Sequence, residues 1–271
     1  MYLALLSLLL AFEQPPSPLQ PSSAHATVQV RTDVAWVGPE QSFHLVVVIT
    51  PEEGWHVYWK DPGASGAPTE FEIHAPSGYT VGEPQFPRPS IFRNEEGITY
   101  GYEKQVAVFI PIEAPKNIDT SEANFEVTTF WLACKKICIM GEQQQKVRVS
   151  TNEKTQGPTH RDMRLAQWQR LLPKQLAELP NATQQILENS IQITGTTPQK
   201  QIGFIGIDQD GVRFLQSNLV LLDNNRFVLT IPITPENADV RTINGLLTLG
   251  SNTSDPCYVV QVVTKPVTKH N

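Results

Sequence analysis

The residues of this sequence best suited to chemistry are two cysteines four positions apart, Cys134 and Cys138, in the stretch WLACKKICIMGE. Two lysines, Lys135 and Lys136, lie between them. A disulfide bond needs Cα atoms roughly 4.4–6.8 Å apart, whereas four residues of extended chain span about 13 Å. The two cysteines can therefore bond only if the chain folds back at the three residues that separate them.

These thiols have three possible uses: disulfide exchange, a structural staple or a metal site. The thiolate is the nucleophile in exchange, and Lys135 and Lys136 would favour that form by their charge; they could equally be ordinary solvated turn residues. A staple that closes so small a loop adds little stability, because the entropic benefit grows with loop size, and this favours a redox pair. A zinc or copper site would have to include the third cysteine, Cys257, and one of the six histidines. The sequence has no second closely spaced cysteine pair and no HxxxH pair, so we expect no metal and expect Cys257 to pack as a small buried hydrophobe.

Length and composition limit the classes of protein that could carry this pair. The 271 residues suffice for one large or two ordinary domains. The net charge of −6 argues against binding to a phosphate backbone. The 22 prolines and 16 glycines, together with runs of Val, Ile and Thr, favour an all-β fold with many turns.

The amino terminus, MYLALLSLLLAF, is apolar but too short to span a bilayer, and it suits the core of a signal peptide. No Lys or Arg follows Met1 directly, and a small-x-small cleavage site lies at residues 24–26, although cleavage earlier in the stretch is also possible. A buried N-terminal helix is the alternative. Because prolines and serines follow the apolar stretch, we assign residues 1–26 to a signal peptide and leader and expect a periplasmic location. No later segment is long and apolar enough to span a membrane.

Short strands with regular turns follow over residues 27–150. The stretch TVQVRTDVAWV alternates, FHLVVVIT is a continuous apolar run, and NFEVTTFWLAC leads directly into the cysteine pair. Seven or more such strands predict an immunoglobulin-like β-sandwich. Residues 151–185 read as a linker with a helix in MRLAQWQRLL, where apolar residues recur at helical spacing. Strands resume over 186–271, which predicts a second, smaller β-sandwich domain.

Three segments, in this order, carry a family resemblance: GWHVYWKDPGASGAPTEF, ITYGYEKQVAVFIPIEA and FWLACKKICIMGE. Together they resemble the N-terminal periplasmic domain of the thiol:disulfide interchange protein DsbD, in the form found in ScsB-like proteins. The later stretch RFVLTIPITPENADVRTINGLLTLG looks like the region that follows this domain in ScsB-like proteins. The resemblance implies an immunoglobulin-like fold that carries electrons through Cys134 and Cys138 without a cofactor.

The resemblance also indicates which residues surround the pair. Tyr100 and Tyr102, in TYGYE, match the cap region that covers the cysteines until a partner docks, and His56 and Tyr58 match aromatic positions beside them. These tyrosines could instead be core or rim aromatics of a sandwich. The cysteine spacing is shorter than in the best-known DsbD domain. By family analogy we expect Cys138 to be the nucleophile.

The resemblance implies partner proteins as well. A membrane-embedded electron donor of the DsbD/ScsB type would reduce the pair, and periplasmic thioredoxin-like proteins would accept the electrons. The family's membrane-spanning carrier and thioredoxin-like domain do not occur in this sequence, so we expect the donor to be a separate chain. We expect neither nucleic acid nor a small-molecule substrate. The leading hypothesis is a thiol-disulfide oxidoreductase module of the protein-disulfide reductase type. The alternative is a non-enzymatic periplasmic binding module with a permanent disulfide or a metal-handling role.

Overall fold

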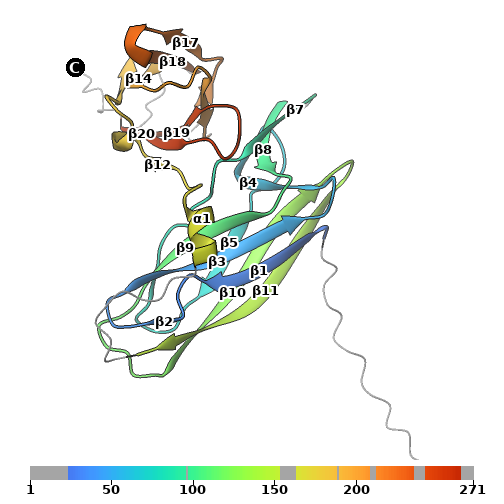
Figure 1. Ribbon diagram of the computed structural model, residues 1–271. Helices are drawn as coiled ribbons and strands as arrows, with labels where there is room; N and C mark the ends of the chain where they lie inside the picture. Colours follow the sequence, from blue (N-terminus) through green and yellow to red (C-terminus); the bar gives the residue numbers. More distant parts are fainter. Residues whose placement is uncertain are drawn as a thin grey trace, which may run out of the picture.

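The computed structural model describes residues 24–95, 97–152, 163–187, 189–207, 212–234 and 242–263. Its strands form four sheets, two from the first half of the chain and two from the second. The predicted architecture is confirmed: an all-β chain with a β-sandwich, a linker helix and a second, smaller sandwich (Figure 1). The predicted signal peptide lies almost entirely outside the described residues.

The first sandwich consists of a four-stranded and a seven-stranded sheet. The four-stranded sheet has the order β1 (Ala26–Thr32), β3 (Ser42–Pro51), β9 (Val106–Glu113) and β6 (Thr80–Val81). The seven-stranded sheet has the order β2 (Trp36–Val37), β11 (Cys138–Thr151), β10 (Glu122–Cys134), β4 (His56–Gly63), β8 (Gly97–Tyr102) and β7 (Ser90–Asn94), and β5 (Glu70–His74) also pairs with β10. All neighbours are antiparallel except β2 and β11.

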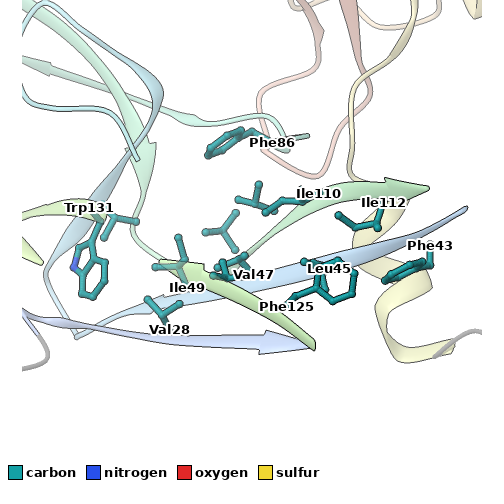
Figure 2. Close-up of a cluster of buried hydrophobic side chains, with 14 of the residues drawn as sticks. Val28, Phe43, Leu45, Val47, Ile49, Phe86, Ile110, Ile112, Phe125 and Trp131 are labelled. Atoms are coloured by element: carbon teal, nitrogen blue, oxygen red, sulfur yellow. The ribbon is translucent and has the colours of Figure 1, made fainter. Parts of the chain in front are cut away.

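The continuous apolar run in β3 is explained by burial on both faces of that strand. Phe43, Leu45 and the other odd-numbered residues face the sandwich core, where they meet Phe125 from β10 (Figure 2). The even-numbered Val46 and Val48 face outwards and pack with Leu165 of the linker helix α1 (Met163–Gln169). Full burial of a Val, Leu or Phe side chain contributes about 1.5–3 kcal/mol, so this double coverage makes β3 a central support of the fold.

The second sandwich has its own core and its own two sheets. The first sheet has the order β12 (Lys174–Gln175), β20 (Cys257–Val263), β19 (Thr242–Leu249) and β15 (Ile202–Gly206). The second has the order β13 (Thr183–Leu187), β14 (Ser190–Thr196), β18 (Arg226–Thr234) and β16 (Arg213–Phe214), with β17 (Asn218–Leu221) also paired to β18. Two 3-10 helices, η1 (Leu176–Glu178) and η2 (Asp223–Asn225), complete it.

A buried arginine ties the two sandwiches together. Arg88 is 6% exposed, and its Nη1 and Nη2 donate hydrogen bonds to the carbonyl oxygens of Leu249 (2.9 Å) and Gly250 (3.1 Å). Ile205 and Leu246 of the second sandwich join the hydrophobic core cluster of the first. The second sandwich therefore packs at the end of the first where β4, β7 and β8 lie (Figure 1).

None of the helices in the described part of the chain has the length and apolar character needed to cross a membrane.

Candidate functional site

The cysteine pair closes the hairpin of β10 and β11, which runs along one side of the first sandwich (Figure 1). Cys134 and Cys138 lie directly opposite each other as the last pair of this ladder, with Cα atoms 4.2 Å apart, and they form a disulfide bond. The backbone N–H of Lys135 donates to the Ile137 carbonyl oxygen at 3.1 Å and turns the chain. The fold-back required by the spacing of the cysteines is thus present.

A tryptophan and a glycine fix the base of this hairpin end. Gly141 lies opposite Trp131 in the ladder, and a Cβ atom at Gly141 would overlap the indole ring. The ring is 3% exposed, and its Nε1 donates a hydrogen bond to the Ala24 carbonyl oxygen at 3.2 Å. The tryptophan therefore anchors the hairpin to the segment before β1 and does not depend on the disulfide bond for its position.

The two cysteines differ in their access to solvent. Cys134 is 3% exposed, whereas Cys138 is exposed, as are Lys135 and Lys136 of the turn. Ile137, between the lysines and Cys138, is 64% exposed. An incoming sulfur atom can therefore approach the bond from the Cys138 side, while Cys134 is covered by protein.

His56 lies next to the buried cysteine. It is the direct neighbour of Cys134 in the pairing of β4 with β10, and directly opposite residues carry their side chains on the same face of a sheet. Their neighbours Val57 and Ala133 belong to the core, so Cys134 and His56 project from the other face, which we call the cysteine face. Tyr58 lies two residues further along β4 on this face, and its ring meets His56 edge-on at 5.2 Å.

Tyr58 is covered by the loop that follows β4. The residue is 5% exposed, and Gly66 in this loop has φ +103° and lies so close that a Cβ atom there would overlap the Tyr58 ring. Thr69 Oγ1 donates a hydrogen bond to the Tyr58 carbonyl oxygen at 2.6 Å. The stretch DPGASGAP therefore contains a glycine where the chain must pass closely over the tyrosine in a left-handed conformation.

Phe92 of β7 is a residue of the cysteine face that the sequence analysis missed. Its ring packs against His56 with a centroid distance of 4.8 Å. It lies in PQFPRPSIFRNEEG, where three prolines and little periodicity indicated an irregular loop, whereas residues 90–94 form a strand paired with β8. The sequence offered one signal for Phe92, namely an aromatic residue in the segment that precedes the TYGYE motif. Phe92 thus forms a ring contact with the residue beside Cys134.

Tyr100 and Tyr102 are turned away from the cysteine face. The pairing of β4 with β8 sets Tyr58 opposite Gly101, so Gly101 shares the cysteine face and its two neighbours face the core. Tyr102 is 7% exposed and donates a hydrogen bond to the Pro87 carbonyl oxygen at 2.8 Å. Tyr100 packs edge-on against the core residue Trp59 at 6.1 Å. Both tyrosines belong to the β7–β8 hairpin that borders the site. The aromatic residue that this hairpin places on the cysteine face is Phe92.

Two comparisons with known proteins concern the first sandwich and the fold of the chain. Residues 21–150 match the family model described as "Thiol:disulfide interchange protein DsbD, N-terminal". The resemblance that the three sequence segments indicated is thus confirmed for the part of the chain that carries the cysteine pair. The fold of the whole chain is similar to that of the N-terminal periplasmic domain of ScsB from Proteus mirabilis, with a TM-score of 0.59 and 16% identity over 94% of this chain and 97% of that one.

A second solved structure covers a smaller part of the chain. The DsbD N-terminal domain of Neisseria meningitidis in its reduced form matches 49% of this chain and 91% of its own length, with a TM-score of 0.33 and 14% identity. No curated protein matches the chain by sequence. Cys134 and Cys138 both lie within the residues that match the family model.

The titratable side chains near the cysteine pair include a histidine and two lysines. Burial lowers the pKa of His56, and Glu103 acts in the opposite direction with a smaller effect, so the imidazole is biased towards its neutral form. Lys135 Nζ donates to the Glu53 carbonyl oxygen at 3.5 Å and lies over Gly54. Neither Lys135 nor Lys136 forms an ion pair within the described residues. The formal charge closest to the cysteines along the chain is therefore positive, which favours a thiolate.

Cys257 takes no part in this site. It is free, 3% exposed and lies in β20 of the second sandwich. Burial raises its pKa to about 11, with Arg88 acting in the opposite direction, so it remains a protonated thiol at neutral pH. Among the residues that the structure describes, no group of three or more His, Cys, Asp or Glu side chains could hold a metal ion.

Proposed function

We propose that this chain is a periplasmic thiol:disulfide reductase module that passes electrons from a Cys134/Cys138 dithiol to thioredoxin-like proteins. The observation that carries the proposal is the asymmetry of the pair, with Cys138 exposed and Cys134 buried at the end of a hairpin. The match of residues 21–150 to the family model of the DsbD N-terminal domain supports it. A periplasmic location is consistent with the ScsB domain whose fold the chain shares.

The reaction begins with the reduced pair. The Cys138 thiolate attacks one sulfur of the partner's disulfide, a Cys138–partner bond forms, and the partner's other sulfur leaves as a thiolate that takes up a proton. Cys134 then loses its proton, and its sulfur attacks Cys138 Sγ. The Cys134–Cys138 bond forms as the mixed disulfide breaks, and the partner leaves as a dithiol. Two electrons and two protons have moved from the module to the partner.

Each residue of the site has a part in this proposal. The exposed Cys138 meets the partner, and the buried Cys134 is kept for the second, intramolecular attack. Lys135 and Lys136 favour the attacking thiolate by their positive charge. Phe92 and His56, in ring contact beside Cys134, screen this buried sulfur from other oxidants. Tyr58, held under its loop, supports the position of His56.

The module must be reduced again after each turnover. The disulfide present in this structure is the product of electron transfer to a partner. A dithiol donor therefore has to reverse the two exchange steps, first by attack on Cys138 and then by release of Cys134. We propose that a membrane-embedded carrier of the DsbD/ScsB type, on a separate chain, is this donor.

A trapping experiment tests the proposal and the roles of the two cysteines. Without its resolving cysteine, the module cannot complete the internal second step, so the mixed disulfide accumulates. We expect reduced Cys134→Ser, which retains Cys138, to form a covalent complex with an oxidised thioredoxin-like protein on a non-reducing gel. Dithiothreitol should abolish the complex, and Cys257→Ser serves as the matched control that should behave as wild type.

The outcomes separate the alternatives. If Cys138→Ser traps the partner and Cys134→Ser does not, the function stands and the roles are reversed. If neither variant traps a partner and the wild-type bond resists reduction by thioredoxin, the chain is instead a binding module with a permanent disulfide.

A further inference from the structure

A large cleft lies between the β7–β8 hairpin and the second sandwich, away from the cysteine face. Its volume is about 980 Å³, at the upper end of the range typical of ligand sites in proteins. Residues from both sandwiches line it: Asp61, Gly63, Ala64, Arg93, Ile98 and Tyr100 from the first, and Phe204, Gly206, Arg213, Phe214, Leu215, Gln216 and Ser217 from the second. The thiol reaction proposed above uses none of this surface.

Two arginines give the cleft its charge, one from each sandwich. Neither Arg93 of β7 nor Arg213 of β16 forms an ion pair or a side-chain hydrogen bond within the described part of the chain. Asp61 is the one acidic residue among the described residues that line the cleft, and its Oδ1 already accepts a hydrogen bond from the Gly63 N–H at 2.9 Å. In a chain of net charge −6, these two guanidinium groups have no ion-pair partner among the described residues. Guanidinium groups bind carboxylates in paired, directional hydrogen bonds.

The second sandwich contributes an aromatic wall to the cleft, in which two rings pack against each other. Phe204 and Phe214 pack edge-on with ring centroids 5.3 Å apart. A Cβ atom at Gly206 would overlap the Phe214 ring, so the glycine permits this ring to lie flat against the strand. Tyr100 adds a ring from the first sandwich. The cleft can thus take apolar side chains beside its charged groups.

The strands that border the cleft suggest the form of its ligand. Among the described strands, β7, β15 and β16 are each the last strand of their sheet. Edge strands have unpaired backbone N–H and C=O groups along one side, which an extended peptide can pair with. Alternation along such a peptide would place acidic residues on one side and apolar residues on the other.

We propose that this cleft binds an acidic peptide segment in an extended conformation, with carboxylates on Arg93 and Arg213 and apolar side chains on the Phe204–Phe214 wall. The partner is thus a protein with an exposed strand-like stretch of alternating acidic and apolar residues. This binding does not depend on the thiol reaction, because none of its groups belongs to the cysteine face.

Fluorescence anisotropy with defined probes tests the proposal on the full chain. The probe is a short fluorescein-labelled peptide of alternating glutamate and valine, and the matched probe carries glutamine in place of glutamate. We expect the acidic probe to bind and the neutral probe to bind at least tenfold more weakly. Arg93→Gln and Arg213→Gln should each weaken the acidic probe roughly tenfold, as expected for the loss of one charge-assisted hydrogen-bond pair.

Arg226→Gln is the control, because Arg226 is an exposed arginine of the second sandwich that does not line the cleft. Its affinity for the acidic probe should equal that of wild type. Equal binding of the two probes, or equal weakening by Arg226→Gln, would overturn the role of the arginine pair. If free glutarate displaces the probe as effectively as unlabelled peptide, the site takes small dicarboxylates, and the peptide proposal is rejected.

Discussion

Reduction of the Cys134–Cys138 bond should leave the fold intact, at a cost that can be worked from the size of the loop. The bond joins residues only four positions apart. For a closed loop of this size, the chain-entropy model gives a loss of about 2 kcal/mol in the free energy of unfolding at 25 °C, compared with about 4.7 kcal/mol for a loop of 100 residues. We therefore expect the reduced protein to remain folded and to be about 2 kcal/mol less stable.

The structure gives a reason why the loss should not exceed this value. The β10–β11 ladder continues from the cysteines to the pair of Glu122 and Ser150, and Trp131 is anchored to Ala24 by its own hydrogen bond. These contacts do not involve sulfur. A carrier that alternates between oxidised and reduced forms benefits from such independence, because neither form has to refold.

Urea denaturation followed by circular dichroism, with and without dithiothreitol, measures this difference. The midpoint should fall on reduction while the slope with urea stays unchanged, since the surface exposed on unfolding is the same. A variant with serine at both positions should match the reduced wild type under both conditions, which controls for effects of the reductant. A loss above about 4 kcal/mol, or loss of the β-sheet signal on reduction, would refute the reasoning and identify the bond as a structural staple.

Two further predictions concern the aromatic cover of the pair and the response to alkali. In reduced Cys138→Ser, Phe92→Ala should raise the rate at which iodoacetamide alkylates Cys134 several-fold, because the ring packs on His56 beside Cys134. Tyr100→Ala should leave this rate unchanged, and the reverse pattern would contradict the assignment. The pKa of Cys257, raised by burial to about 11 from 9.0, means that the folded state keeps a proton that the unfolded state loses. The free energy of unfolding should therefore be unaffected by this group below pH 9 and fall between pH 9 and 11. Urea titrations across that range should show a smaller decrease for Cys257→Ala, and an identical decrease would mean that other groups cause it.

Much of this fold could be predicted because a strand shows its burial in the sequence. Alternation identified β1 and β10, and the spacing of Cys134 and Cys138 showed that a bond between them required a fold-back, which the structure contains. The continuous apolar run in β3 indicated a strand inside the sandwich, and a helical pattern was visible at MRLAQWQ. What the sequence did not reveal is that the second face of β3 is covered by this helix, through Leu165. That contact joins elements more than 100 residues apart, which local patterns do not encode.

The surroundings of the cysteines were harder to predict, because they depend on register. A shift of one residue between paired strands exchanges the two faces of a sheet. In the observed register, Gly101 lies opposite Tyr58, so both tyrosines of TYGYE face the core. Phe92, on the neighbouring strand β7, contacts His56 instead. The two tyrosines of the TYGYE motif lie in β8, whose hairpin with β7 borders the cysteine face. Only the pairing of three strands, β4, β8 and β7, decides which ring lies on the cysteine face.

The same pairing restricts how the site could open for a partner. Both ends of the segment that carries Phe92 are held: Arg88, before β7, binds the Leu249 and Gly250 carbonyl oxygens, and Tyr102, at the end of β8, binds the Pro87 carbonyl oxygen. Arg88 and Tyr102 are both buried, so a swing of the whole hairpin would leave buried donors and acceptors unpaired, at about 1–3 kcal/mol for each group. Rotation of the Phe92 side chain, or bending of the hairpin beyond Arg88, breaks none of these bonds. We therefore expect access to Cys134 to be gained by a local movement at Phe92, with the second sandwich holding the base of the hairpin in place.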